Sequence, residues 1–162
     1  MNKIAIYPGT FDPFTNGHLD LVLRSVRLFD RLIIAVTTNV KKTPLFSVPE
    51  RMALIEKSLP AGSNISVESF GGLLVDYAEK RGSIIVIRGL RAVSDFEYEM
   101  QMALLNRRLN PNIETIFKMS SEEYSFLTST AVKEIAQLGG SVEGLVPPAV
   151  KSALMEKFKN NT

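Results

Sequence analysis

The sequence predicts an α/β protein with a Rossmann-like, doubly wound parallel sheet of five strands and helices on both faces. Short apolar runs alternate with stretches of helical periodicity along the whole chain. The runs are apolar at successive positions, which is typical of parallel strands that are covered on both faces. No repeat, low-complexity segment or linker divides the 162 residues, so we expect one domain over residues 1–162.

Five apolar runs mark the expected strands. The first run is followed by Pro8-Gly9, a pair typical of turns, and the fourth is followed by the charged Arg88. The expected strands span residues 4–7, 32–36, 65–69, 84–87 and 114–118.

Capping and breaking signals bound the expected helices. Ser47 with Glu50 forms a capping box, and Ser94 with Glu97 repeats the signal later in the chain. Gly139 and the glycine after it are typical of a helix end, and proline is tolerated in a first helical turn. The expected helices span residues 17–29, 47–59, 73–80, 94–108 and 128–138, with a last one opened by Pro147-Pro148.

Composition excludes several classes of protein. The chain is 45% hydrophobic and 22% charged, as folded soluble proteins are, and its net charge of +2 is too small for a general nucleic-acid binder. With no cysteine and one histidine, it has neither disulfides nor a thiolate or His-rich metal site. It lacks the apolar runs of a signal peptide or membrane span. We therefore expect a cytoplasmic protein that binds neither nucleic acid nor membranes.

Open parallel sheets bind ligands beyond the carboxyl ends of their strands, near the point where strand order reverses. The segments that follow the expected strands are 8–18, 37–42, 88–91 and 119–130. They contain neither the G-x-G spacing of a dinucleotide fold nor a Walker lysine. If a nucleotide binds here, other residues must hold its phosphates.

The loop after the first strand is the strongest candidate. Gly9 and the small polar residues after it leave backbone N–H groups and the Thr10 hydroxyl available to an anion. His18 falls in the first turn of the next helix. A lone histidine is often a surface or capping residue, but the glycine before it and its place at the sheet edge favour a site residue. A helix N-terminus disfavours imidazolium, and a bound polyphosphate would reverse that bias.

Cationic side chains follow two other strands. The fork of Arg88 suits a phosphate, as does that of Arg91, although a salt bridge with Asp95, Glu97 or Glu99 would also explain such arginines. The pair Lys41-Lys42 follows the second strand and is either a phosphate contact or a solvated pair.

Three consecutive hydroxyl residues, Thr128 to Thr130, stand at an expected helix start with Lys133 one turn on. Their N–H groups, hydroxyls and the positive end of the helix dipole suit an anion. One of them would suffice for ordinary N-capping, so three favour a binding role. Asp12 has no carboxylate partner whose spacing demands acid/base work.

Three motifs together resemble a known family. Residues 9–13, GTFDP, with TNGH at 15–18 resemble the T/H-x-G-H signature of the nucleotidyltransferase superfamily. Residues 87–91, IRGLR, with DFEYEM at 95–100 are similar to the sequence typical of bacterial phosphopantetheine adenylyltransferases. Residues 125–133 resemble the superfamily's second signature, I-S-S-T-x-x-K. Thr15 stands where many superfamily members have histidine, and Thr128 stands where serine is commoner.

This resemblance implies transfer of AMP from ATP to 4′-phosphopantetheine, which gives dephospho-coenzyme A and pyrophosphate, with Mg²⁺ as cofactor. It also implies a homohexamer and coenzyme A as a feedback ligand. Since the acceptor is already an oxyanion, the reaction needs no protein nucleophile, only alignment and charge neutralisation. The helix over residues 94–108 has more apolar residues than one buried stripe takes, so we expect part of it to contact another subunit.

The resemblance assigns roles to individual residues. Thr10 and His18 would act on the α-phosphate as the catalytic pair. Lys42 and Arg88 would hold the acceptor's phosphate, with Leu74 along the pantetheine arm and Thr10 shared by both substrates. The residues assigned to ATP are Thr10, Phe11, His18, Gly89, Leu90, Arg91, Glu99, Tyr124, Ser125, Phe126, Leu127, Thr128, Ser129 and Thr130.

Two other functions fit parts of the pattern. Another superfamily member would act on nicotinamide mononucleotide, flavin mononucleotide or a sugar or polyol phosphate, and the stretch from Arg88 to Met100 argues against it. A regulatory module that binds nucleotide without turnover would need the hydroxyl residues. It would have no use for His18 together with two separate cation clusters.

Overall fold

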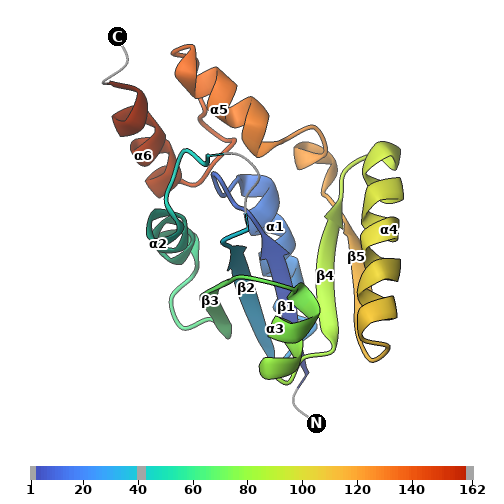
Figure 1. Ribbon diagram of the computed structural model, residues 1–162. Helices are drawn as coiled ribbons and strands as arrows, with labels where there is room; N and C mark the ends of the chain where they lie inside the picture. Colours follow the sequence, from blue (N-terminus) through green and yellow to red (C-terminus); the bar gives the residue numbers. More distant parts are fainter. Residues whose placement is uncertain (1–2, 40–42, 160–162) are drawn as a thin grey trace.

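The computed structural model describes residues 3–39 and 43–159, and these contain a five-stranded parallel sheet. The strands are ordered β3-β2-β1-β4-β5, so the chain runs from β1 to one edge and then returns to build the other half (Figure 1). The predicted fold class is confirmed. The strands are β1 (Ile4–Gly9), β2 (Arg31–Thr37), β3 (Ile65–Phe70), β4 (Ile85–Leu90) and β5 (Glu114–Met119).

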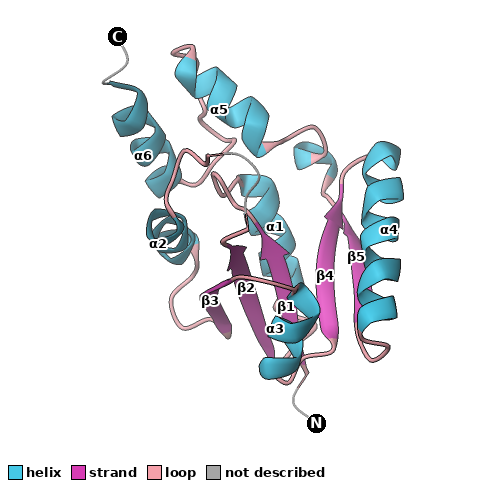
Figure 2. Cartoon of the chain, in the orientation of Figure 1, coloured by secondary structure: helices cyan, strands magenta, loops and turns pink. Residues whose placement is uncertain are grey.

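Helices cover both faces of this sheet, and the strand arrows point toward one end of it (Figure 2). Apolar residues of α1, α2, α5 and α6 pack on one face, and those of α3 pack on the other, where α4 also lies. No helix in the described ranges is long and apolar enough to cross a membrane. The helices are α1 (Asn16–Ser25), α2 (Val48–Ser58), α3 (Leu74–Lys80), α4 (Val93–Leu109), α5 (Ser129–Gln137) and α6 (Pro148–Lys159), with a 3₁₀ turn η1 (Glu122–Tyr124).

The pleat of the central strands divides the core into two layers. Ala5 and Tyr7 face α1, whereas Ile6 between them faces α3. Ile33 and Ile34 of the neighbouring strand divide in the same way, and both are fully buried. Because side chains alternate across a strand, a run that is apolar at every position supplies both layers at once.

The sheet opens between β1 and β4 at its carboxyl end. These strands pair only at Ala5 with Ile85 and at Ile6 with Val86. Pro8 has no N–H with which to continue this ladder, and its carbonyl instead accepts a hydrogen bond of 2.9 Å from the Arg88 guanidinium. The predicted turn at Pro8-Gly9 is therefore wrong, because both residues lie in β1 and pair with β2.

Two other predicted boundaries were wrong. The helix expected over residues 17–29 ends at Ser25, whose hydroxyl donates back to the Leu21 carbonyl at 2.6 Å. The apolar spacing continues to Phe29 only because that side chain packs on the core from a turn. The fourth strand extends through Arg88 to Leu90, because its pairing with β5 continues over these residues.

The two predicted capping boxes differ in outcome. Ser47 and Glu50 make both reciprocal hydrogen bonds at the start of α2, which confirms the first box. The second is wrong, because α4 begins at Val93 after Ala92, so Ser94 lies inside its first turn. The Asp95 carboxylate accepts the backbone N–H of Arg91 at 3.2 Å instead, which satisfies a donor just before the helix.

Candidate functional site

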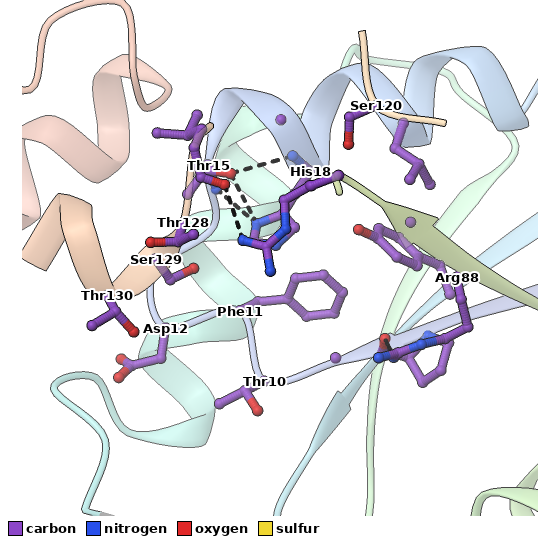
Figure 3. A pocket seen from close by; sticks show the side chains of 18 of the residues that line it. Thr10, Phe11, Asp12, Thr15, His18, Arg88, Ser120, Thr128, Ser129 and Thr130 are labelled. Atoms are coloured by element: carbon purple, nitrogen blue, oxygen red, sulfur yellow. Dashed lines mark hydrogen bonds between the residues drawn. The ribbon is translucent and has the colours of Figure 1, made fainter. Parts of the chain in front are cut away.

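A large cavity lies where β1 and β4 part, at the carboxyl end of the sheet. Its volume is about 830 Å³, which suits a cofactor-sized ligand. Figure 3 shows the hydroxyl residues of α5 on one side of His18 and Phe11, with Arg88 on the other. The predicted site residues that line this cavity are Thr10, Phe11, His18, Arg88, Gly89, Arg91, Glu99, Tyr124, Leu127, Thr128, Ser129 and Thr130.

A second cavity of about 340 Å³ adjoins the first. Leu74, the residue predicted for the pantetheine arm, lines it together with Phe70 and Met102. The residues common to both cavities are Pro8, Gly9, Thr10, Asn39, Arg88 and Glu99. The two cavities therefore meet at the carboxyl ends of β1 and β4.

The loop after β1 is held in a sharply bent conformation. Phe11 has a φ of 52°, in the left-handed region that few residues other than glycine adopt. Its ring folds back over Gly9, where a Cβ atom would lie 2.8 Å from the ring. Glycine is therefore needed at position 9 for this bend. The bend places Thr10 at the border of the two cavities.

The ring of His18 is fixed in one orientation. Its Nδ1 accepts the backbone N–H of Thr15 at 3.0 Å and lies 3.2 Å from the Thr15 hydroxyl (Figure 3). The ring stacks on Phe14 and meets Phe11 edge-on, with centroids 5.6 and 5.1 Å away. Because Nδ1 is an acceptor, the neutral ring carries its proton on Nε2, at the edge left for the cavity.

The surroundings of His18 keep its ring uncharged. Burial, and then the positive charges of Arg91 and Arg88, lower its pKa from 6.5 to about 4. An imidazolium would also turn Nδ1 into a donor that faces the donor N–H of Thr15. At neutral pH the ring is therefore a neutral donor through Nε2. Nearby Tyr7 is also uncharged, since burial raises the pKa of its phenol.

Arg88 lies on the face of β4 opposite to that of its neighbours in sequence, and its charge is paired there. Its Nε and Nη2 donate to the two carboxylate oxygens of Glu99 in α4, at 2.7 and 2.6 Å. Burial opposes the charge of Arg88, but the hydrogen bonds and charge of Glu99 outweigh burial and raise the pKa of the guanidinium. With Pro8 as a third acceptor, two of its five N–H groups make no hydrogen bond to a described residue.

The neighbouring Gly89 faces α1. A Cβ atom there would lie 2.7 Å from a methyl group of Leu21, so glycine allows the helix to approach the strand closely. Arg91 follows at the strand end, where it is paired with Asp95 at 3.1 Å and donates to the Leu127 carbonyl at 3.2 Å. The salt bridges that the sequence left open for these arginines thus exist, and both guanidinium groups still line the larger cavity.

The hydroxyl residues before and in α5 have different partners. Thr128 caps the helix by accepting the N–H of Ala131 at 3.0 Å. Ser129 donates to the Pro13 carbonyl at 2.8 Å, which ties α5 to the loop after β1. Thr130 is exposed, and its hydroxyl makes no hydrogen bond within the described ranges. The first N–H groups of a helix have no partner inside the helix, so this end still suits an anion.

Asp12 and Lys133 form an ion pair of 2.9 Å across the cavity's edge. The same carboxylate accepts the backbone N–H groups of Leu45 and Phe46, each at 2.9 Å. Three hydrogen bonds leave Asp12 little capacity for a metal ion. No cluster of three or more acidic or histidine side chains occurs among the described residues.

Some predicted residues are not brought into the site. Leu90, Ser125 and Phe126 do not line either cavity, and Phe126 is 70% exposed. Ser125 and Phe126 directly follow η1, whose last residue, Tyr124, does line the larger cavity. Lys42 lies outside the described residues.

Sequence reasoning also missed a buried arginine in α2. Arg51 is 1% exposed and donates to the carbonyls of Phe46, Thr10 and Thr37. A signal for it existed, because Arg51 shares the spacing of the buried Leu54 and Ile55 on one face of α2. A charged residue in an apolar stripe implies a buried partner.

Comparison with known proteins identifies relatives of this chain. A family described as cytidylyltransferase-like matches residues 6–135. A phosphopantetheine adenylyltransferase of Alkaliphilus oremlandii is 53% identical over 156 residues, which are 96% of this chain and 99% of that protein. One of Thermodesulfovibrio yellowstonii is 54% identical over 160 residues, or 98% of this chain and 99% of that protein.

Solved structures with low identity share the fold. A bifunctional NMN adenylyltransferase/ADP ribose pyrophosphatase of Francisella tularensis, complexed with AMP and a manganese ion, superposes with a TM-score of 0.70 at 15% identity. That match covers 99% of this chain and 52% of the other. A candidate nicotinate-nucleotide adenylyltransferase of Vibrio parahaemolyticus gives 0.68 at 18% identity, with 99% and 93% covered.

The environment of His18 predicts an acidic titration that is simple to observe, because it is the chain's single histidine. In the folded, ligand-free protein, its imidazole NMR signals should titrate near pH 4, with the Nε2–H tautomer above that pH. In denaturant the same signals should titrate near 6.5. Since folding lowers this pKa, the resulting stabilisation is complete above pH 6.5 and is lost as the pH falls toward 4. Titration of the folded protein between pH 6 and 7 would contradict the buried, acceptor-bound ring.

Proposed function

The chain belongs to the phosphopantetheine adenylyltransferase family, and we propose from this premise that it transfers AMP from ATP to 4′-phosphopantetheine, giving dephospho-coenzyme A and pyrophosphate. The meeting of the two cavities at Thr10 and Arg88 carries the proposal. The larger cavity takes ATP. The smaller takes the pantetheine arm against Leu74, so that the acceptor's phosphate comes to the shared border.

The reaction is a direct in-line displacement. An oxygen of the acceptor's phosphate attacks the α-phosphorus of ATP, the bond from that phosphorus to the bridging oxygen breaks, and pyrophosphate leaves with the electron pair. Arg88 holds the acceptor's phosphate with its remaining N–H groups, and the resemblance assigns Lys42 to the same phosphate. Two anions must be brought together, so neutralisation and alignment supply most of the rate enhancement.

His18 and Thr10 act at the α-phosphate. The Nε2–H of His18 donates to a non-bridging oxygen on which negative charge accumulates as the new bond forms. The fixed ring makes this donor available without reorganisation, because Thr15 and Phe14 hold it before substrate arrives. The start of α5 and Arg91 hold the β- and γ-phosphates.

Three further features belong to the proposal. Magnesium arrives bound to the phosphates of ATP, a role supported by the lack of an acidic cluster among the described residues. Coenzyme A, which contains the phosphopantetheine group, occupies the same cavities as a feedback ligand. The need for ATP supports a cytoplasmic location.

The proposed assembly is a homohexamer. α4 has apolar side chains that this chain alone does not cover, and several exposed apolar side chains on one helix are typical of a subunit contact. They are Phe96, Met100, Met102, Leu104, Leu105 and Leu109, between 37% and 58% exposed.

The first test is the choice of acceptor. With ATP and Mg²⁺, pyrophosphate release should require 4′-phosphopantetheine and should be absent with unphosphorylated pantetheine, which lacks both nucleophile and anchor. Nicotinamide mononucleotide should be inactive.

Arg88→Ala should lower kcat/KM for the acceptor. The corresponding loss of transition-state stabilisation is roughly 1.5–3 kcal/mol, the scale of a hydrogen bond to a charged group. The matched control Arg27→Ala changes an exposed arginine remote from both cavities. Comparable turnover of unphosphorylated pantetheine would refute the proposal.

The second test separates rate from affinity. His18→Ala should bind ATP within a few-fold of wild type but turn over about 10²–10³ times more slowly, since its donor acts mainly on transition-state charge. Arg91→Ala should instead weaken ATP binding, because the β- and γ-phosphates are charged before and after the reaction. Calorimetry gives the Kd values, and single-turnover kinetics give the rates. If His18→Ala lost only affinity for ATP, its assigned role would be wrong.

The third test addresses assembly. Light scattering coupled to size exclusion should give six times the 18.0 kDa mass of one chain at micromolar concentration. Leu104→Glu combined with Leu105→Glu should dissociate the oligomer, because each substitution places a charge on the apolar face of α4. Leu28→Glu, at an exposed site outside α4, is the matched control. A wild-type monomer would rule out this use of α4.

A further inference from the structure

Asp12 lines the larger cavity, yet it is only 5% exposed and its carboxylate is held by three hydrogen bonds. Oδ1 accepts the N–H of Phe46, and Oδ2 accepts the N–H of Leu45 and the ammonium of Lys133. These donors come from two segments remote in sequence from the loop after β1. Asp12 is thus a fixed point between that loop, the segment before α2 and α5.

Arg51 approaches the same segments from α2. Its Nε donates to the Phe46 carbonyl at 3.1 Å, and Nη1 donates to the carbonyls of Thr10 and Thr37 at 2.8 and 3.2 Å. Thr37 ends β2, and Thr10 stands at the border of the two cavities. Burial lowers the pKa of Arg51 and the Asp12 charge counters this effect, but a guanidinium stays protonated in proteins.

The two buried charges meet at one residue. Asp12 holds the backbone N–H of Phe46, and Arg51 holds its carbonyl. The Phe46 side chain is itself 1% exposed in the core. Phe46 is therefore fixed at both polar backbone atoms and by its ring, in a segment that is neither helix nor strand.

This arrangement bears on the border of the two cavities. Thr37 lines the smaller cavity and Asn39 lines both, whereas Thr43 and Pro44 line the larger one. Arg51 holds the chain at Thr37, and Asp12 holds it at Leu45 and Phe46. Arg51 also bonds to Thr10, so one side chain links the two walls of the cavity border.

We propose that Asp12 and Arg51 are positioning residues that jointly set the distance of Thr37, Leu45 and Phe46 from Thr10. They act without touching either substrate. This inference rests on the proposed function, since the distance they set is that between the acceptor's phosphate and the α-phosphate of ATP. Reacting atoms tolerate little misplacement, and a shift of 1 Å lowers rates by roughly 10²-fold.

The two substrates should respond differently to a change at Asp12. Asp12→Asn keeps the side chain's size but removes its charge and one of its two acceptor oxygens, so Leu45 and Phe46 are held less firmly. The same change releases Lys133, which lines the larger cavity, and leaves that cavity more positive. Binding of the ATP polyanion should then be unchanged or tighter, while use of the acceptor should worsen. If Asp12 had only a structural role, the substitution would weaken both the binding of ATP and the use of the acceptor.

The experiment compares wild type, Asp12→Asn and Arg51→Lys. We expect kcat/KM for 4′-phosphopantetheine to fall at least tenfold in both variants. The Kd for ATP should be at most three times the wild-type value. Asp30→Asn and Lys57→Ala are matched controls, because Asp30 also accepts a backbone N–H but is exposed, and Lys57 is an exposed cation on α2. Equal losses for both substrates, or none, would overturn the proposal.

Hydrogen exchange supplies a measurement that needs no variant. In ligand-free wild type, the amides of Leu45 and Phe46 should exchange at least tenfold more slowly than the loop amides of Ala61 and Gly62, which are exposed residues. Fast exchange at Leu45 and Phe46 would show that Asp12 does not hold these amides. It would refute the positioning role even if Asp12→Asn and Arg51→Lys failed to fold. Absence of pyrophosphate release by wild type with every acceptor would instead refute the proposed function and leave the exchange result standing.

Discussion

The separation of β1 from β4 beyond Ile6 is the feature on which the site depends. A central parallel strand normally continues its hydrogen bonds on both sides, but Pro8 has no N–H to donate. Arg88 replaces the missing ladder with a side-chain bond to the Pro8 carbonyl. The sheet therefore stays intact on the β2 side and opens on the β4 side. Because strand order also reverses there, a crevice forms between two rigid strands, where a ligand can reach both.

A neutral histidine among cations solves a particular chemical problem. A positively charged ring would bind the ground-state polyphosphate strongly, and affinity gained equally in the ground and transition states does not raise kcat. The packing of Phe11 and Phe14 and the N–H of Thr15 keep His18 uncharged and oriented. In the proposed reaction its donor would therefore gain most where charge accumulates, and the permanent charges of the arginines would provide affinity.

Much of the fold followed from local signals, whereas much of the site did not. Apolar runs located all five strands, and the Ser47 box located α2, because both signals depend on residues close in sequence. The strand character of Pro8 and the end of α1 at Ser25 depend on tertiary contacts that no local pattern contains. In the same way, motif spacing located Thr10, His18 and Arg88. Which of the nearby carboxylates pairs with Arg88, and that Arg51 bonds to Thr10, depend on how the segments pack.

The cations that line the larger cavity are already paired before any substrate binds. Among the described residues, Arg88 has Glu99, Arg91 has Asp95 and Lys133 has Asp12 as carboxylate partner. Each carboxylate fixes the position of its cation and lowers the net attraction for an anion. The ion pairs thus lower the affinity of the site for polyphosphate and at the same time fix the positions of its cations. In the proposed transfer, a weaker net attraction would also let pyrophosphate leave more readily.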